Sequence, residues 1–153
     1  MVQNMNVPTN VTNVAPETQY QEDLFVYAVD FPVTAASGSS EANIQIEADS
    51  YFKWIKGTFY AFQDGVDPET TDATRPIPPL KIQITDSGSG RQLFNIPVFV
   101  STIFGEGDLP FINPIPRIFL PRSNISFSAQ NQSAVDAWNL SLQLVGVKGF
   151  RSN

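Results

Sequence analysis

The chain has 153 residues with a formal net charge of −6, of which 42% are hydrophobic and 16% charged, and this length suits one domain. It contains no cysteine and no histidine, which excludes disulfides, thiolate zinc sites, cysteine nucleophiles and serine–histidine triads. Seven acidic residues precede the first basic residue, Lys53, so we expect no direct nucleic-acid binding, which needs a basic surface.

Residues 1–21 are rich in Asn, Thr, Val, Pro and Gln and show no periodicity. Pro8 and Pro16 oppose a helix here. The pattern predicts an extended N-terminal arm, either disordered or ordered against a neighbouring subunit. The segment lacks the basic start and continuous apolar core of a secretory signal. No stretch approaches the roughly 20 apolar residues of a membrane helix, so we expect no membrane partner.

Alternating apolar and polar residues, typical of half-buried strands, recur from residue 22 onward. Loop-forming sequences rich in Gly, Pro, Asp and Ser separate the strands. The pattern predicts about eight strands, at residues 24–31, 43–49, 50–62, 80–87, 91–104, 117–120, 124–130 and 137–150. We therefore expect residues 22–153 to form an all-β domain, a two-sheet sandwich of the jelly-roll type.

Two details of this pattern predict local structure, one the face of a strand and the other a turn. The alternation in residues 50–62 predicts that Phe52, Trp54, Tyr60 and Phe62 share one face. The sequence Asp-Ser-Gly-Ser-Gly at 86–90 lies between two strong strand patterns and predicts a hairpin turn.

Some segments carry more apolar residues than a two-layer module hides. Residues 24–31 and 92–104 are apolar on both faces, and Pro97 predicts an edge strand or a bulge in the second. In residues 105–124, four prolines alternate with large apolar side chains, which favours a stiff contact segment or, alternatively, a buried crossover between the sheets. The predicted partner-contact residues are Phe25, Tyr27, Pro97, Phe99, Phe111, Ile112, Pro114, Ile115 and Pro116.

The acidic loop at residues 64–79 does not match a calcium-binding motif. An EF-hand requires acidic residues at alternate positions, a Gly at the sixth and a Glu at the twelfth. The loop fails that spacing, so we interpret it as solvated and predict no metal site. Its carboxylates are Asp64, Asp67, Glu69 and Asp72.

Two further kinds of site compete with a contact surface. Glu47 and Asp49 share one face of a predicted strand, as a glycosidase pair would, but that face is the polar one. Tyr51, Trp54 and Tyr60 are candidates for stacking on a sugar, although this pattern is more typical of core or interface aromatics. We predict no catalytic and no cofactor-binding residue, and hence no enzyme.

The C-terminal third carries a resemblance. It combines a proline-containing segment that leads into a strand (PIPRIFLPRSN, 114–124), a strand with Asn and Ser (NISFSAQNQS, 124–133) and a final strand ending in a Gly-x-Lys turn (WNLSLQLVGVKGF, 138–150). Over about 60 residues, this pattern resembles the small jelly-roll head decoration, or cement, proteins and related minor virion proteins of tailed bacteriophages.

The resemblance implies a structural virion protein on the capsid exterior, assembled in the host cytoplasm. Members of that family commonly form trimers that brace neighbouring major capsid subunits, so the implied partners are further copies of the chain and the major capsid protein. No catalytic residue or cofactor is implied. The alternative is a carbohydrate-binding or receptor-binding β-sandwich module of a phage fibre or spike.

Overall fold

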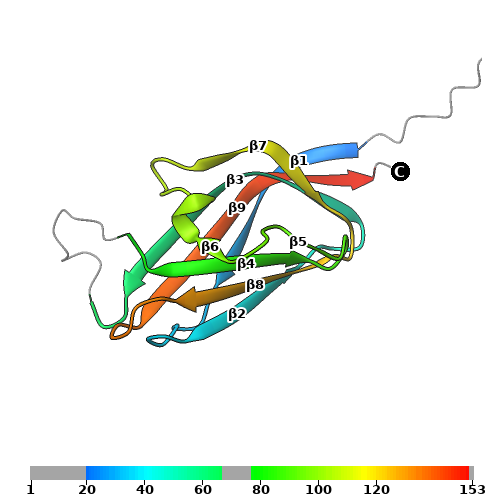
Figure 1. Ribbon diagram of the computed structural model, residues 1–153. Coiled ribbons are helices and arrows are strands. Elements are labelled where there is room, and N and C mark those ends of the chain that lie inside the picture. The colour runs from blue at the N-terminus through cyan, green and yellow to red at the C-terminus, as the bar shows by residue number, and fades with distance from the viewer. Residues whose placement is uncertain (1–19, 67–76, 152–153) are drawn as a thin grey trace, which may run out of the picture.

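The computed structural model describes residues 20–66 and 77–151, and these form two antiparallel sheets packed as a sandwich. Figure 1 shows the sheets facing each other, with β4 and β8 in front of β3 and β9. The predicted all-β sandwich is confirmed. The first strand begins at Tyr20, two residues before the predicted domain boundary, and the remainder of the predicted arm lies outside the described residues.

The strand order is that of a jelly roll. Sheet A has the order β1 (Tyr20–Asp30), β9 (Trp138–Arg151), β3 (Ser50–Gln63) and β7 (Phe111–Phe119). Sheet B has the order β2 (Ser39–Gln45), β8 (Asn124–Asn131), β4 (Leu80–Asp86) and β5 (Arg91–Gln92), and β6 (Val98–Phe99) also pairs with β4. Because β5 and β6 share one place beside β4, the nine strands fill eight positions, as the jelly roll requires.

The core lies between the inner faces of the sheets. In β4 the burial alternates residue by residue, so that Leu80, Ile82 and Ile84 are fully buried. Leu140, Leu142 and Leu144 of β9 form the corresponding row of sheet A, and aromatic rings of β3 and β7 fill the space beside them. These buried residues are the inward-facing members of the alternation that the sequence predicts.

A bulge in β3 changes which residues face inward. The register of β3 with β9 and β7 shifts between Trp54 and Lys56. Since one extra residue reverses all later side chains, Phe52 and Trp54 are buried, whereas Tyr60 is exposed and Phe62 only half-buried. The prediction that these four aromatic residues share one face is therefore wrong.

The proline-rich segment forms an edge strand. A strand was predicted only at residues 117–120, but β7 spans Phe111–Phe119 at the edge of sheet A. It pairs with β3 at both ends and not across Pro114 and Pro116, where Asn113 Nδ2 donates to the Trp54 carbonyl oxygen at 3.3 Å. An edge strand tolerates proline because its outer N–H groups have no ladder partner. The segment is thus not a buried crossover.

The long strand predicted at residues 91–104 is interrupted. The chain forms the two-residue strands β5 and β6 and then the 3₁₀ turn η1 (Val100–Thr102). Pro97 immediately precedes β6, in agreement with its predicted edge position. The turn directs Val100 and Phe104 into the core, and this explains part of the apolar excess in the segment.

Candidate interaction surface

The outer face of sheet B is polar. The outward positions of β2, β8 and β4 lie in register, so that Glu41 is opposite Ser128 and Ser128 is opposite Gln83. No large apolar side chain occupies these alternate positions within the three described strands. The polar set comprises Glu41, Asn43, Gln45, Ser126, Ser128, Gln130, Lys81, Gln83 and Thr85.

The outer face of sheet A carries aliphatic side chains on β1, β9 and β7, with two lysines between them on β3. Two cross-strand rows run from β1 to β7 through the paired residues of β9 and β3. The first row is Leu24, Val147, Lys53 and Ile118, and the second is Val26, Val145, Lys56 and Ile112. We call these eight residues the apolar band.

The side chains at the two ends of the apolar band are the most exposed. Leu24 is 79% exposed, Ile112 65%, Ile118 54% and Val26 46%. A single exposed aliphatic residue is ordinary, but several gathered on one face of a sheet mark a contact site. Sheet A thus carries the candidate interaction surface.

Charge is distributed unevenly over this face. Lys53 and Lys56 lie within the band on β3, and neither has an ion-pair partner among the residues that the structure describes. On β1, Glu22 and Asp30 occupy the same alternate positions as Leu24 and Val26. Acidic groups therefore lie on the β1 side of the face and basic groups on the β3 side.

The predicted contact residues fall into separate places. Ile112, Pro114, Ile115 and Pro116 are exposed together on β7, with Phe111 half-buried at its start. Phe99 is exposed on the edge of sheet B, where Lys81 Nζ lies 5.1 Å from its ring, and Pro97 is half-buried nearby.

The two predicted contacts on β1 point inward. Tyr27 is buried in the core and Phe25 is half-buried against it, so the outward residues of this strand are Leu24 and Val26. Apolar residues on both faces of β1 gave no signal to distinguish them. The register with β9 makes the distinction, because it places Leu24 and Val26 opposite Val147 and Val145.

A buried lysine, Lys148, contacts the aromatic residues on the inner face of β1. Lys148 Nζ lies 2.8 Å from Glu47 Oε2 and 4.4 Å from the centroid of the Phe25 ring. The Tyr27 hydroxyl donates to the same Glu47 oxygen at 2.5 Å. A buried ammonium needs a counter-charge, and aromatic faces stabilise it further.

The same cluster shifts two pKa values. Partial burial raises the pKa of Glu47, but the hydrogen bonds from Lys148 and Tyr27 outweigh this and hold it below 4.5. Burial, followed by the hydrogen bond to Glu47, raises the pKa of Tyr27 well above its usual value. Glu47 is therefore engaged in the fold, not free to pair with Asp49 as a catalytic acid.

Replacing this lysine tests the role of the cluster. We expect Lys148→Met to lower the free energy of unfolding by about 2 kcal/mol at pH 7, because a charged hydrogen bond and a cation–π contact are lost. The folded-state pKa of Glu47 lies below 4.5, so this contribution is complete above that pH and is lost as the pH falls through the folded-state pKa. Urea unfolding at pH 7 and pH 3 should show a smaller difference between wild type and variant at pH 3. A difference that grows on acidification would contradict this assignment.

A second tyrosine–carboxylate contact lies at the end of the apolar band. The Tyr51 hydroxyl donates to Glu22 Oε1, and the Tyr20 ring packs against Tyr51 edge to face. The hydrogen bond to Glu22, with partial burial, raises the pKa of Tyr51 to about 12. This contact ties the first residues of β1 to β3.

An alkaline titration checks that contact. The Tyr51 ring resonances should titrate near pH 12 in the wild type and move toward the ordinary value of 10.0 in Glu22→Gln. Because the folded-state pKa is raised, the contribution to stability is complete below pH 10 and is lost as the pH rises through about 12. Asp23→Asn, on the opposite side of the strand, is the matched control and should leave the titration unchanged.

Other kinds of site find little support in the described residues. Across residues 20–66 and 77–151, no three His, Cys, Asp or Glu side chains are placed to hold a metal ion. The same residues contain no helix long and apolar enough to cross a membrane. Of the four carboxylates in the predicted acidic loop, Asp64 accepts a hydrogen bond from Asn139 Nδ2 at 3.1 Å, and the other three lie outside the described residues.

Comparisons with known proteins assign no family. No protein-family model, no curated protein and no solved structure matches the chain.

Proposed function

We propose that this chain is a non-enzymatic structural protein that self-associates and stabilises a phage head as a capsid decoration, or cement, subunit. The observation that carries the proposal is the apolar band on the outer face of sheet A. It lies outside a sandwich whose own core is already filled by the inner faces of both sheets. Such a surface is the kind that a neighbouring polypeptide covers.

The energetics favour a protein partner over a small ligand. Fully burying an aliphatic side chain of this size contributes about 1.5–3 kcal/mol. Association costs roughly 4–15 kcal/mol in lost translational and rotational freedom, so several such side chains must act together. The band supplies them on the outer face of sheet A, from β1, β9 and β7.

The charge distribution favours a second copy of the chain on this face. Acidic groups lie on the β1 side of the face, and the β3 lysines have no ion-pair partner among the described residues, so a head-to-tail contact that sets the β1 side of one copy against the β3 side of the next brings opposite charges together. We place homo-oligomerisation here, and the trimer implied by the family resemblance is the state that we propose on the capsid.

The exposed edge of β7 is where we place the contact with the major capsid protein. Ile115 is 85% exposed and Leu120 is 55% exposed, next to prolines that hold the strand extended. The polar face of sheet B would then remain in water. Jelly rolls recur in viral capsid domains, which agrees with this role, although the fold alone assigns no function.

Co-sedimentation tests the capsid role. Empty shells assembled from the major capsid protein of the same genome should carry the wild-type chain into the pellet. Ile115→Asp should weaken this binding at least tenfold and leave self-association unchanged, whereas Val135→Asp, an exposed site outside β7 and the band, should have no effect. A chain that self-associates but stays in the supernatant would contradict the decoration role alone.

A carbohydrate-binding module remains the second candidate, and one observation favours it. Tyr60 is exposed on sheet A, its ring lies 5.6 Å from that of Phe62, and Ser141 is its partner in β9. Trp54 is buried and is removed from the proposed stacking set. If Tyr60→Ala abolishes binding to a glycan array without changing the melting temperature, this second function replaces the first.

A further inference from the structure

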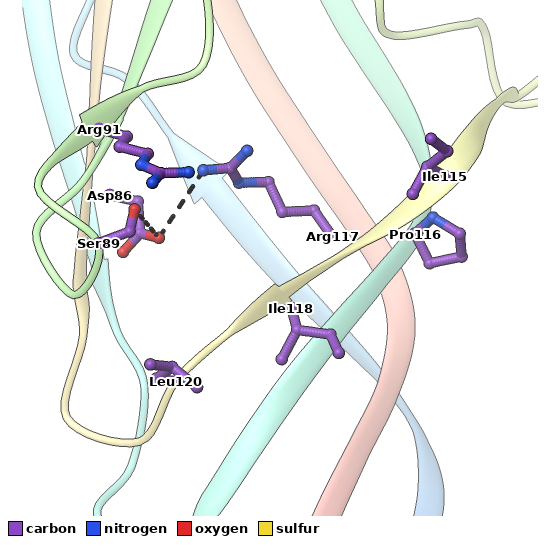
Figure 2. A pocket seen from close by; sticks show the side chains of 8 residues that line it. All are labelled: Asp86, Ser89, Arg91, Ile115, Pro116, Arg117, Ile118 and Leu120. Atoms are coloured by element: carbon purple, nitrogen blue, oxygen red, sulfur yellow. Dashed lines mark hydrogen bonds and ion pairs between the residues drawn. The ribbon is translucent and has the colours of Figure 1, made fainter.

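A pocket of about 620 Å³ opens between the two sheets beside the β4–β5 turn. Figure 2 shows it from close by: the turn supplies Asp86, Ser89 and Arg91 on one side, and β7 supplies Arg117 with Ile115 and Ile118 on the other. The pocket is separate from the two cross-strand rows, except that Ile118 contributes to both.

The acidic group of this pocket is already satisfied by its own turn. Asp86 is buried, and its carboxylate accepts hydrogen bonds from the Gly88 amide at 2.9 Å and from Ser89 Oγ at 2.8 Å. Gly88 fits closely here, since a Cβ atom on it would lie 2.0 Å from Ser123 Oγ. The carboxylate therefore organises the predicted hairpin turn.

Arg117 is poorly satisfied by comparison. Its Nη2 lies 3.9 Å from Asp86 Oδ2, too far for a hydrogen bond, and its buried Nε has no hydrogen-bond partner among the described residues. A guanidinium has five N–H donors, and a buried donor without an acceptor is costly. This side chain, which lines the pocket, thus has hydrogen-bonding donors that are not satisfied.

A second guanidinium faces the first. In Figure 2, the end of the Arg91 side chain points toward that of Arg117, and both lie above Asp86. Two cations and one carboxylate leave a local charge of +1 in a protein whose formal net charge is −6. An anion bound between the arginines would relieve their repulsion and supply the missing acceptors.

We propose that this pocket binds a carboxylate carried on an apolar stem, as in an acidic side chain of a partner polypeptide, through Arg91 and Arg117. Carboxylate geometry matches the guanidinium fork in a bidentate way. The pocket is far larger than a bare inorganic ion, and the isoleucines of β7 offer an apolar wall for the stem. The pocket shares Ile115 and Leu120 with the proposed capsid contact, but the inference concerns the isolated chain and its test needs no capsid.

Side-chain NMR of the full chain tests the site with hexanoate as the probe. The Arg117 side-chain resonances should shift saturably with hexanoate, because its guanidinium gains an acceptor. Hexanamide, the neutral analogue, should produce no saturable shift, and inorganic phosphate should bind at least threefold more weakly than hexanoate.

Two variants complete the test. Arg91→Gln, at an exposed position, should raise the hexanoate dissociation constant at least tenfold, and Arg122→Gln, an exposed arginine outside the pocket, should not change it. Backbone amide spectra report that each variant is folded. Absence of a saturable hexanoate shift, an equal response to hexanamide, phosphate binding as tight as hexanoate, or an unaffected Arg91→Gln would each overturn the assignment.

Discussion

Gly146→Ala is expected to cost about 3 kcal/mol of unfolding free energy, the upper end of the usual range for overpacking. Gly146 of β9 lies opposite Trp54, directly beside the β3 bulge. A Cβ atom at this position would lie 2.0 Å from the carbonyl oxygen of Lys53. The clashing atom belongs to the backbone of a central strand, so no side-chain rotation relieves it.

Chemical denaturation followed by circular dichroism measures the effect. Gly107→Ala is the matched control, because a Cβ atom there meets nothing within 4 Å, and it should change the unfolding free energy by less than about 0.5 kcal/mol. If Gly146→Ala is as mild as this control, the close packing of β9 against the bulge is wrong, and so is the assignment of faces that depends on it.

The double variant Leu24→Asp, Ile118→Asp should abolish self-association while leaving the fold intact. These residues end the first row of the apolar band, and both side chains are largely exposed in the single chain. Burying two carboxylates in an apolar contact should raise the dissociation constant for self-association at least 100-fold, which corresponds to about 2.8 kcal/mol.

Sedimentation velocity over a concentration series measures that change. Ile96→Asp and Val135→Asp introduce the same charge at exposed apolar sites outside the band and should associate like the wild type. A double variant that associates like these controls would place the contact elsewhere on the molecule.

Period-two patterning predicted the sandwich because each strand needs one buried face. The pattern failed where a single residue breaks the period. The bulge at Ile55 requires no unusual residue type, so nothing in the sequence of β3 reveals it, yet it turns Tyr60 and Phe62 to the outside.

Segments apolar on both faces limited the prediction of the interaction surface. In β1, alternation alone cannot distinguish Phe25 and Tyr27 from Leu24 and Val26, and the distinction comes from the register with β9. On β7, by contrast, proline has few places in a sheet other than an edge. The predicted contacts of that strand are accordingly exposed, except Phe111, which is half-buried.

The pocket between the sheets could not be predicted from sequence. Arg117 and Asp86 belong to different sheets, and only the jelly-roll crossover brings them together. Each residue alone resembles an ordinary charged side chain near a turn or strand end. Long-range juxtaposition of this kind leaves no local periodicity.

Hydroxyl-radical footprinting of the full chain at low and high concentration tests the central claim most directly, namely that the outer face of sheet A is covered by a neighbouring copy. We predict that oxidation of Leu24, Ile112 and Ile118 falls at least threefold as the oligomer forms. Ile96 and Val135, which are exposed outside the band, should stay equally reactive. Equal reactivity of the band residues in monomer and oligomer, or a chain that remains monomeric at every concentration, would contradict the claim.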